Sequence, residues 1–585
     1  NNLFDTARTP FIGSGGDILT MPPDWDFGET IDDMSRLDES LRPFKIETER
    51  RKTTAGARWQ FAEPWTLDVK VSHETKDGTD ILGAATGAGF GTGVGSVTSS
   101  ILPMPVDYTT DQVEVKLGYA KGRGNLELAY YYSGFDNKDD SLTWQNPFAS
   151  VSDTGVLRTS EVGAMALPPD NDFHRFALSG GYRLGDTTRL SGALSWGRMS
   201  QNQAFEPITV NPALDVTDGM PRQDLGDADI ADVFLRLASR PLERTNVRAT
   251  YRYHERDDDF DAMTYSYVVA DSRPGGEVTT DPLKYQRHDF DLGGDYRFND
   301  ITLLSLDYAY ERMNRDYEAA ERKKTDENAL YAKLRFDVHS DVQFTLYGGR
   351  ADRDGSRYEV KSEIQNPLLR KYNYADRKQD KVGARVLWMP TDDVSVSASF
   401  DYLADDYNNS AIGLTDARHQ VFSVDGAWVP FENLSLHGFW TYEDIAYTQA
   451  NSEDDGPATW STDLTDRVGT GGVGADYLLP GDRWRLGLTY AESQGTGQTD
   501  VAGANVTNNY PDIRSNVRTV ELSATYNYSE NLDLKFAWWY ERYRSDDWAL
   551  DGVEPDRPLD SVLATGEDSP NYDANVLMMS GIYRW

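Results

Sequence analysis

The sequence predicts an all-β protein that folds as one large antiparallel transmembrane β-barrel. Apolar and polar residues alternate with period two in paired segments of about ten residues, the pattern of strands with one apolar face. These pairs recur along the whole 585-residue chain, so no stretch stands out as a separate globular domain. No apolar run reaches the roughly eighteen residues that a transmembrane helix needs.

The clearest pair of segments runs from Val517 to Arg542. Apolar residues alternate with polar ones in its first arm, and after the short turn at Ser529–Asn531 the second arm repeats the pattern. Its apolar face combines aliphatic and aromatic residues, as expected of strands that face lipid and finish at a headgroup interface. We interpret it as a membrane-spanning hairpin.

Nine further hairpins of the same form precede this one. A last strand, Leu577–Trp585, ends the chain on an aromatic residue, and the prediction is therefore 21 strands. The hairpins are expected at Leu41–Val71, Val113–Tyr132, Phe176–Trp196, Val233–Tyr253, Phe290–Tyr308, Leu330–Leu346, Val386–Phe400, Phe422–Trp440, Val473–Tyr490 and Val517–Arg542.

Connections within hairpins are expected to be short, whereas those between hairpins are usually long. Examples of the long ones are Lys76–Asp111, Asp136–Asp172 and Tyr543–Asn575. Bacterial outer-membrane barrels have short turns on the periplasmic side and long loops outside. The sequence therefore predicts an integral protein of the bacterial (Gram-negative) outer membrane, with its hairpin turns on the periplasmic side and its long loops outside.

The overall composition agrees with such a barrel. Mean hydropathy is −0.62, which does not argue for solubility because barrel strands are apolar only at every second residue. The 33 Tyr and 14 Trp suit interfacial girdles, and the absence of Cys excludes disulfides, thiolate zinc sites and covalently attached haem on this chain. A net charge of −38 argues against nucleic-acid binding.

The strand count has a consequence for the front of the chain. Residues 41–585 are assigned to the barrel and residues 1–40 to an irregular external loop region. Because bacterial single-chain barrels have an even number of strands with both ends inside, we expect at least one strand upstream of Asn1. The alternative is that Asn1–Met21 itself supplies a weak strand.

No residue pattern predicts a catalytic, cofactor-binding or metal site. The seven histidines occur singly without metal-ligand spacing, and acidic clusters such as Asp257–Asp259 and Glu453–Asp455 lack EF-hand spacing. We interpret those clusters as solvated loop charge, with Ca²⁺ binding left open. The Gly83–Gly95 run does not match a phosphate-binding loop and is expected to be an external loop.

The residues expected to face the barrel interior are small or polar and of mixed charge. Such a surface fits a water-filled pore and equally fits packing against another protein inside the barrel, and no internal segment looks like a plug. These residues are Glu114, Lys116, Gly118 and Ala120 on one strand, Ser191 and Ala193 on another, and Glu521, Ser523 and Thr525 on a third.

Several stretches resemble the MtrB/PioB family of outer-membrane barrels, the sheath proteins of transmembrane electron conduits. Leu368–Arg377 (LLRKYNYADR) is the most specific of them. The others are Leu19–Trp25, Pro105–Asp111, Met199–Ala204, Thr325–Asn328, Arg353–Ser356 and Ile412–Thr415, in the order of the family. The family has further strands at the front and, in some members, a Cys-x-x-Cys there; this chain has neither.

The resemblance implies a complete barrel of 26 strands whose function is mostly geometric. A periplasmic multihaem cytochrome c of the decahaem type would be threaded into the barrel, and the external loops would dock a surface multihaem cytochrome. Haem c would be carried by these partners, and none would be bound by this chain. Electrons would cross to extracellular acceptors such as metal oxides, or enter the cell, and this chain would not be an enzyme.

Two alternatives belong to other functional classes. The first is an outer-membrane porin or nutrient transporter with an open or plugged lumen. The second is a lipopolysaccharide-inserting barrel. It is less favoured because proteins of that class are disulfide-bonded, whereas this chain has no Cys.

Overall fold

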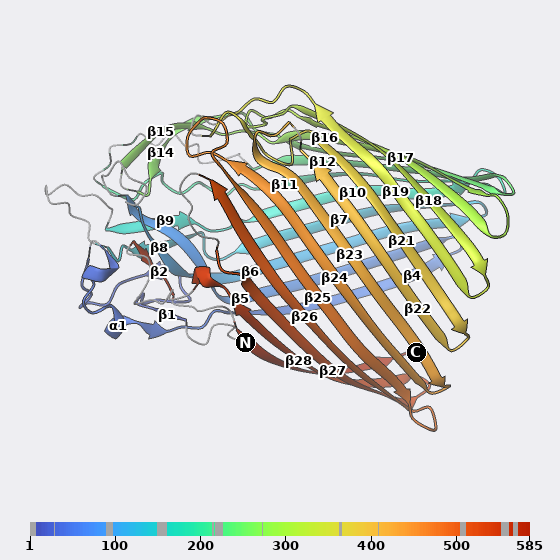
Figure 1. Cartoon of the computed structure of the whole chain (residues 1–585). Coiled ribbons are helices and arrows are strands. Elements are labelled where there is room, and N and C mark those ends of the chain that lie inside the picture. Colours follow the sequence, from blue (N-terminus) through green and yellow to red (C-terminus); the bar gives the residue numbers. More distant parts are fainter. Residues whose placement is uncertain are drawn as a thin grey trace.

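The chain forms a barrel whose strands slope steeply across the wall (Figure 1). The structure is a computed structural model and describes residues 7–28, 30–88, 97–148, 161–212, 214, 216, 226–271, 273–361, 365–407, 409–503, 510–550, 561–565 and 571–584. No helix among these residues is long and apolar enough to cross a membrane.

The wall contains the ten predicted hairpins and the last strand, hence 21 long strands in the described chain, and the predicted fold class is confirmed. The last strand is β30 (Tyr572–Tyr583); Trp585 lies outside the described residues. The hairpins are β4 (Glu47–Ala62) with β5 (Trp65–Ala88), β6 (Val97–Lys121) with β7 (Gly124–Asn137), β10 (Asn171–Arg183) with β11 (Thr188–Ser200), β12 (Ala228–Leu242) with β13 (Thr245–Asp258), β16 (Lys284–Arg297) with β17 (Thr302–Arg315), β18 (Lys324–His339) with β19 (Val342–Gly355), β21 (Arg377–Thr391) with β22 (Val394–Asp406), β23 (Ile412–Phe431) with β24 (Leu434–Asn451), β25 (Trp460–Leu478) with β26 (Trp484–Gly503), and β27 (Ile513–Ser529) with β28 (Leu532–Asp546).

The remaining elements are short and lie mostly at the end opposite the hairpin turns. Two-residue strands β20 (Leu369–Arg370) and β29 (Val562–Leu563) pair in parallel with β23 and β6. Outside the wall are β1 (Arg8–Thr9) with β3 (Arg42–Pro43), β2 (Ile18–Leu19) with β8 (Ser141–Gln145) and β9 (Val162–Ala166), β14 (Thr264–Val269) with β15 (Arg273–Thr279), the 3₁₀ turns η1 (Ile31–Asp33) and η2 (Trp548–Leu550), and helix α1 (Leu37–Ser40).

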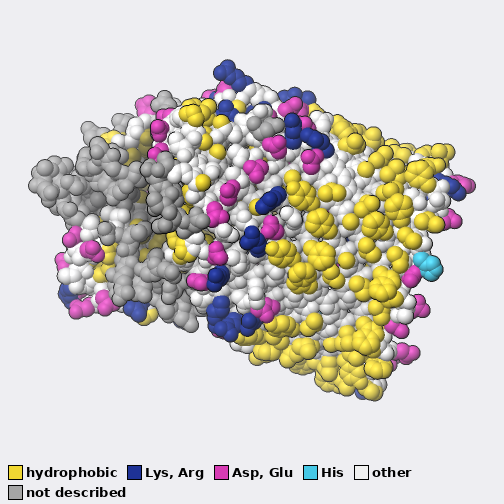
Figure 2. Space-filling view, in the orientation of Figure 1, with side chains coloured by type: hydrophobic (Ala, Val, Ile, Leu, Met, Phe, Trp, Pro, Cys, Tyr) yellow, Lys and Arg dark blue, Asp and Glu magenta, His cyan; other side chains and the backbone are white. Residues whose placement is uncertain are grey.

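The antiparallel registers place apolar residues beside apolar residues on one face of the wall. Across β26, β27 and β28, for example, Leu488 is opposite Leu522 and Leu522 is opposite Trp538. A shift by one residue would turn this whole set toward the other face, so the alternation specifies the register. The apolar face is the outside, where Figure 2 shows a broad hydrophobic band over the half of the barrel nearer the hairpin turns.

Aromatic side chains border this outer face at two levels. Near the turns, the rings of Trp65 and Tyr119 lie 4.8 Å apart, centroid to centroid, and those of Trp484 and Tyr526 lie 4.6 Å apart. Farther from the turns, the same kind of contact joins Tyr130 to Phe176 at 5.0 Å, as part of a second level. Two aromatic levels on either side of an aliphatic band are the arrangement of a transmembrane barrel.

Several strands continue well past the outer aromatic level. β5 and β6 pair from Trp65 and Tyr119 up to Ala88 and Val97, so the expectation that Lys76–Asp111 forms a loop is wrong. Gly83 likewise lies in β5, and only residues 89–96 of this connection lie outside the described residues. The sequence is rich in Gly, Ala, Ser and Thr here, which hid the period of two; backbone pairing with the neighbouring strand supplies the stabilisation that apolar side chains give elsewhere.

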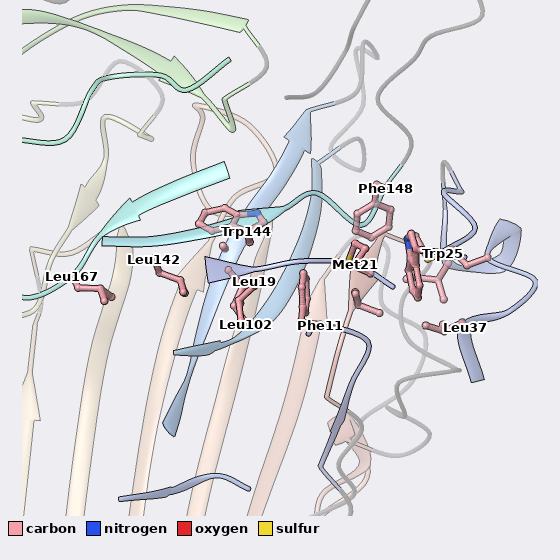
Figure 3. Close-up of a cluster of buried hydrophobic side chains, with 14 residues drawn as sticks. Phe11, Leu19, Met21, Trp25, Leu37, Leu102, Leu142, Trp144, Phe148 and Leu167 are labelled. Carbon is pink, nitrogen blue, oxygen red and sulfur yellow. The ribbon is translucent and has the colours of Figure 1, made fainter. Parts of the chain in front are cut away.

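A small hydrophobic core lies at the long-loop end, built around the N-terminal segment (Figure 3). It buries Phe11, Leu19 and Trp25 together with Leu142 and Trp144 from β8. The Trp25 indole donates a hydrogen bond to the Pro147 carbonyl at 2.8 Å. Residues 7–21 add no strand to the barrel wall, so the alternative that Asn1–Met21 supplies a barrel strand is wrong for the described part.

The first and last strands of the wall, β4 and β30, are its most exposed part. Every side chain from Glu47 to Phe61 is exposed, and so is every one from Leu577 to Arg584. β4 and β30 are neighbours in the strand order. In the described chain, β4 pairs residue by residue with β5, and β30 with β28, but no such register joins β4 to β30. The expectation of further strands before Asn1 stays a prediction.

Candidate functional site: the barrel lumen and its outer rim

The inner face of the wall is the largest surface available for function. The registers place the residues expected in the lumen on the polar face: Lys116 lies between Asp68 and Ala129, and Ser523 between Gly487 and Ala537. Glu114, Gly118, Ala120, Ser191, Ala193, Glu521 and Thr525 alternate with the outward apolar residues in the same way. The sequence therefore identified the inner face correctly.

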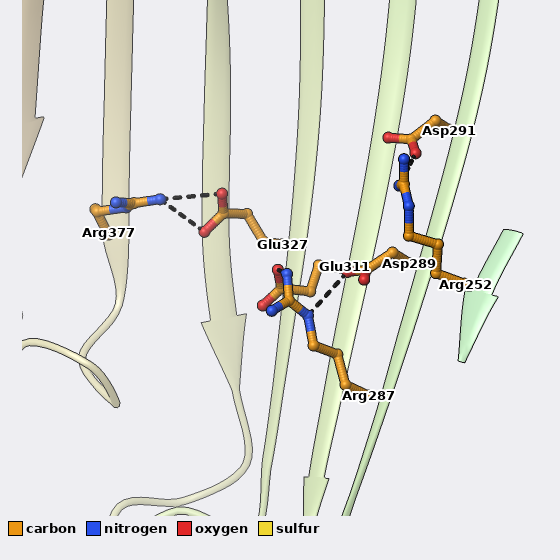
Figure 4. A network of polar contacts seen from close by, with 7 residues as sticks. All are labelled: Arg252, Arg287, Asp289, Asp291, Glu311, Glu327 and Arg377. Atoms are coloured by element: carbon orange, nitrogen blue, oxygen red, sulfur yellow. Dashed lines mark hydrogen bonds and ion pairs between the residues drawn. The ribbon is translucent and has the colours of Figure 1, made fainter. Parts of the chain in front are cut away.

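One part of the lumen wall, from β13 to β21, carries a network of paired charges that we call the charged arc (Figure 4). Arg252 Nη1 donates to Asp291 Oδ2 at 2.6 Å, and Arg287 Nη2 donates to Glu311 Oε2 at 2.8 Å. Arg377 Nη2 reaches both oxygens of Glu327, at 3.0 and 2.9 Å. The first two of these pairs join neighbouring strands, and the third joins β18 to β21 across β19, so opposite charges compensate one another within the wall.

Another part of the wall, from β22 to β26, carries a row of hydroxyl side chains at one level. Consecutive registers place Ser399, Ser423, Thr441, Thr470 and Ser493 next to one another across five strands. Hydrogen bonds join the Ser423 and Thr441 hydroxyls at 3.1 Å and those of Thr470 and Ser493 at 2.9 Å. The side chains of this hydroxyl row are short and polar, so another surface can approach the wall closely here.

The lumen also contains aromatic residues that sit beside outward-facing aromatics in the same strand. Tyr131 faces inward, where its ring lies 5.7 Å from the Arg175 guanidinium, whereas the neighbouring Tyr130 faces outward and contacts Phe176. On β28 the inward residue is Trp539 and the outward one is Trp538. Each pair therefore places one aromatic side chain on the inner face and one on the outer face at nearly the same position along the barrel.

The rim at the long-loop end contains a buried ionic cluster that sequence reasoning missed. Glu321 is 2% exposed and forms an ion pair with Lys371 at 2.7 Å. Arg322 is 6% exposed and forms an ion pair with Asp376, also at 2.7 Å. Arg322 also donates to the carbonyls of Ser356 and Tyr374, both at 2.7 Å. The run Glu321–Lys324 resembles solvated loop charge in sequence, and only tertiary contacts distinguish it.

Two of the family-like stretches meet in this rim cluster. Leu368–Arg377 supplies Lys371 and the Tyr374 carbonyl, and Arg353–Ser356 supplies Arg353, which donates to the Ala375 and Tyr372 carbonyls at 3.0 and 2.5 Å. Burial and the hydrogen bond that it donates to Glu321 raise the pKa of the Tyr358 phenol. The contacts of the cluster therefore join the loop after β19 to the connection before β18.

Other titratable residues bind neighbouring side chains of the wall. His73 contacts Asp111 at 2.7 Å and His254 contacts Asp232 at 2.8 Å, each with one carboxylate partner. A cavity of about 610 Å³ on the outer side of β6, β7, β10 and β11 is lined by Asp111, Asp136 and Asp172 among others. In the part of the chain that the structure describes, no three His, Asp or Glu side chains are arranged to hold a metal ion.

Comparison with known proteins agrees with this architecture. The model of the MtrB/PioB family, described as an outer membrane beta-barrel porin, matches residues 2–585. Outer membrane protein MtrB of Shewanella baltica (strain OS185) is 29% identical over 589 residues, covering 99% of this chain and 80% of that protein.

Solved structures support the fold alone. The Escherichia coli outer membrane transporter YddB has a TM-score of 0.51 at 11% identity, covering 92% of this chain and 76% of that one. The closed form of the ferric-catecholate import receptor Fiu from E. coli K12 has a TM-score of 0.51 at 10% identity, covering 91% and 80%. The protein is an integral outer-membrane barrel, and with a family match over nearly its whole length the chain belongs to the MtrB/PioB family.

Proposed function

We propose that this barrel sheathes a periplasmic multihaem cytochrome c of the decahaem type and holds it against a surface multihaem cytochrome. Electrons would then cross the outer membrane along the haems of the partners. The proposal rests on membership of the MtrB/PioB family and on similarity to a protein named MtrB. This chain would contribute position and insulation, and haem c would be covalently held by the partners, because the chain has no Cys.

The hydroxyl row is the feature of the structure that supports the proposal. Ser423, Thr441 and Thr470 are short side chains at one level of the lumen, and each hydroxyl can both donate and accept a hydrogen bond. Interfaces between proteins need close approach together with about one hydrogen bond per 100–200 Å². A wall of this kind suits a folded protein as its contents.

The charged arc is compatible with the same occupant. Arg377 and Glu327 already satisfy each other, as do Arg252 and Asp291. Covering an ion pair with another protein costs far less than covering an unpaired charge. The lumen wall could therefore be buried without leaving these charges uncompensated.

The proposal is tested by purifying the tagged protein from outer membranes that express its native operon, under mild detergent. We expect a strong Soret band at fixed stoichiometry and a cytochrome that survives salt washing. Colourless protein that forms stable conducting pores by itself would overturn the proposal and favour the alternative.

Site-specific photocrosslinking tests the location of the partner. A benzophenone amino acid in place of the lumen residue Tyr131 or Trp539 should crosslink to a haem-containing protein. The same amino acid at the outward neighbours Tyr130 and Trp538 provides the matched control and should not. Equal crosslinking from both faces would contradict placement of the cytochrome in the lumen.

The alternative is a diffusion channel or nutrient transporter, which the family description as a porin and the polar lumen favour. A channel would fold alone and conduct ions, and its conductance would change with substitutions in the charged arc. A cytochrome-filled barrel would show little conductance until the cytochrome is removed.

A further inference from the structure

Four charged residues lie side by side on the outer face of β26, β27, β28 and β30. Register places Glu492 opposite Arg518, Arg518 opposite Arg542, and Arg542 opposite Asp573. The adjacent outward level, one step toward the hairpin turns, contains Tyr490 and Tyr540. The row therefore sits directly above the outer aromatic level, at the height expected for lipid headgroups.

The two acids of this row are already used by neighbouring groups. Glu492 accepts hydrogen bonds from Tyr490 at 2.8 Å, from Gln494 and Asn516 at 2.9 Å, and from Arg518 Nε at 3.0 Å. Asp573 accepts from Tyr540 at 2.6 Å and from Arg544 Nη2 at 2.5 Å.

Positive charge therefore remains at the centre of the row. Arg518 uses its Nε for Glu492, so its two Nη groups remain outside that contact. Arg542 is exposed and is opposite Asp573 in register, whose carboxylate already accepts hydrogen bonds from Tyr540 and Arg544. Like charges directly opposite each other on neighbouring strands are destabilising. An anion between Arg518 and Arg542 would offset this repulsion, because it attracts both cations.

Below this row the outer face is hollowed into an apolar groove of about 680 Å³. Its outward lining includes Leu488, Leu522, Trp538, Leu577 and Met579. Trp538 lies four residues from Arg542 along β28, which is about 13 Å. Figure 2 shows Lys and Arg side chains at the long-loop border of the hydrophobic band over these strands.

We propose that this surface binds a phosphate-bearing lipid of the outward-facing leaflet. The phosphate would lie between the guanidinium groups of Arg518 and Arg542, and an acyl chain would fill the groove. Guanidinium groups suit phosphate because their planar N–H donors match two oxygens at once. The groove selects a lipid over free phosphate, because only a lipid brings a chain to fill it. The inference is independent of what occupies the lumen.

The test uses the full-length barrel, stripped of lipid in neutral detergent, with bisphosphorylated lipid A as the probe. Native mass spectrometry measures binding of this probe and of the same lipid after phosphatase treatment. We expect the phosphorylated lipid to bind, and both the phosphatase treatment and the double variant R518Q/R542Q to weaken binding about tenfold or more.

Arg350→Gln provides the matched control, because Arg350 lies on the outer face of β19, is exposed and has Asp380 3.7 Å away. It should bind lipid as the unmodified protein does, and retained heat-modifiable migration in gels verifies that each variant is folded. Unchanged binding by folded R518Q/R542Q would overturn the proposal. Displacement of the lipid by millimolar inorganic phosphate alone would also overturn it, because the anion would then bind without the groove.

Discussion

Replacing Arg322 by Ala should release the outer loop that follows β19. The Arg322 side chain is buried, and it contacts Asp376 and the carbonyls of Ser356 and Tyr374, each at 2.7 Å. Removing one partner of a buried ion pair costs about 3–5 kcal/mol, because the other charge stays buried and unpaired. Since about 1.4 kcal/mol is a factor of ten, opening of this loop should become about a hundredfold more frequent or greater.

Hydrogen exchange of the amides in residues 356–361 and 369–377 measures this opening. Arg322→Lys should lose nearly as much protection, because one ammonium group cannot reach all three acceptors as a planar guanidinium does. Arg350→Ala is the control, because its pair with Asp380 is exposed and contributes less than about 1 kcal/mol. Unchanged exchange in the Arg322 variants, or an equal effect in the control, would refute the reasoning.

Three further predictions concern other parts of the barrel. Amides of β4 should exchange faster than those of β24, because residues 47–61 are exposed throughout and β24 has partners on both sides; equal protection would contradict this. Burial raises the pKa of the Asp271 carboxyl, so packing of the β14–β15 turn should be most stable below about pH 4 and weaken as the pH rises from there through the raised pKa. In limited proteolysis, Asp271→Asn should abolish that dependence, and a dependence that persists in the variant would exclude Asp271 as its cause. Ala537→Trp, at a lumen position that is 6% exposed, should lower the free energy of unfolding in denaturant by about 1–3 kcal/mol through overpacking. Leu577→Trp, at an outer-face position that is 83% exposed, should change this free energy little. Equal unfolding midpoints for the two variants would refute this assignment of the two faces.

The barrel wall was predictable because each strand carries its own signal. Leu522 and Ser523 alternate in sequence and face opposite sides in the structure, and the same holds for all ten hairpins. The extension of β5 to Ala88 was not predictable, since its residues there are small and form no apolar period. Strands beyond the membrane depend on backbone pairing, which leaves little trace in side-chain pattern.

The candidate site was predictable only as a surface. Alternation identifies Glu114 and Lys116 as inward residues, but it does not say that Arg377 will meet Glu327 from a strand 50 positions away. The rim cluster was missed for a related reason. Glu321 and Arg322 are adjacent charged residues in a connection, and their burial depends on Ser356, Tyr374 and Asp376.

The arrangement of lumen charges bears on the choice between sheath and channel. A pore that selects ions by charge uses charged side chains of one sign that face the permeating ion. On the charged arc, Arg252, Arg287 and Arg377 instead meet carboxylates on other strands of the wall at 2.6–3.0 Å, so the field that they present to the lumen is largely cancelled. A wall that another protein covers benefits from this cancellation, because a buried unpaired charge is costly. Removing one member should therefore separate the two functions: Glu327→Gln would leave Arg377 with only Asp405 at 3.8 Å, so it should weaken cytochrome retention in a sheath and add anion selectivity in a channel.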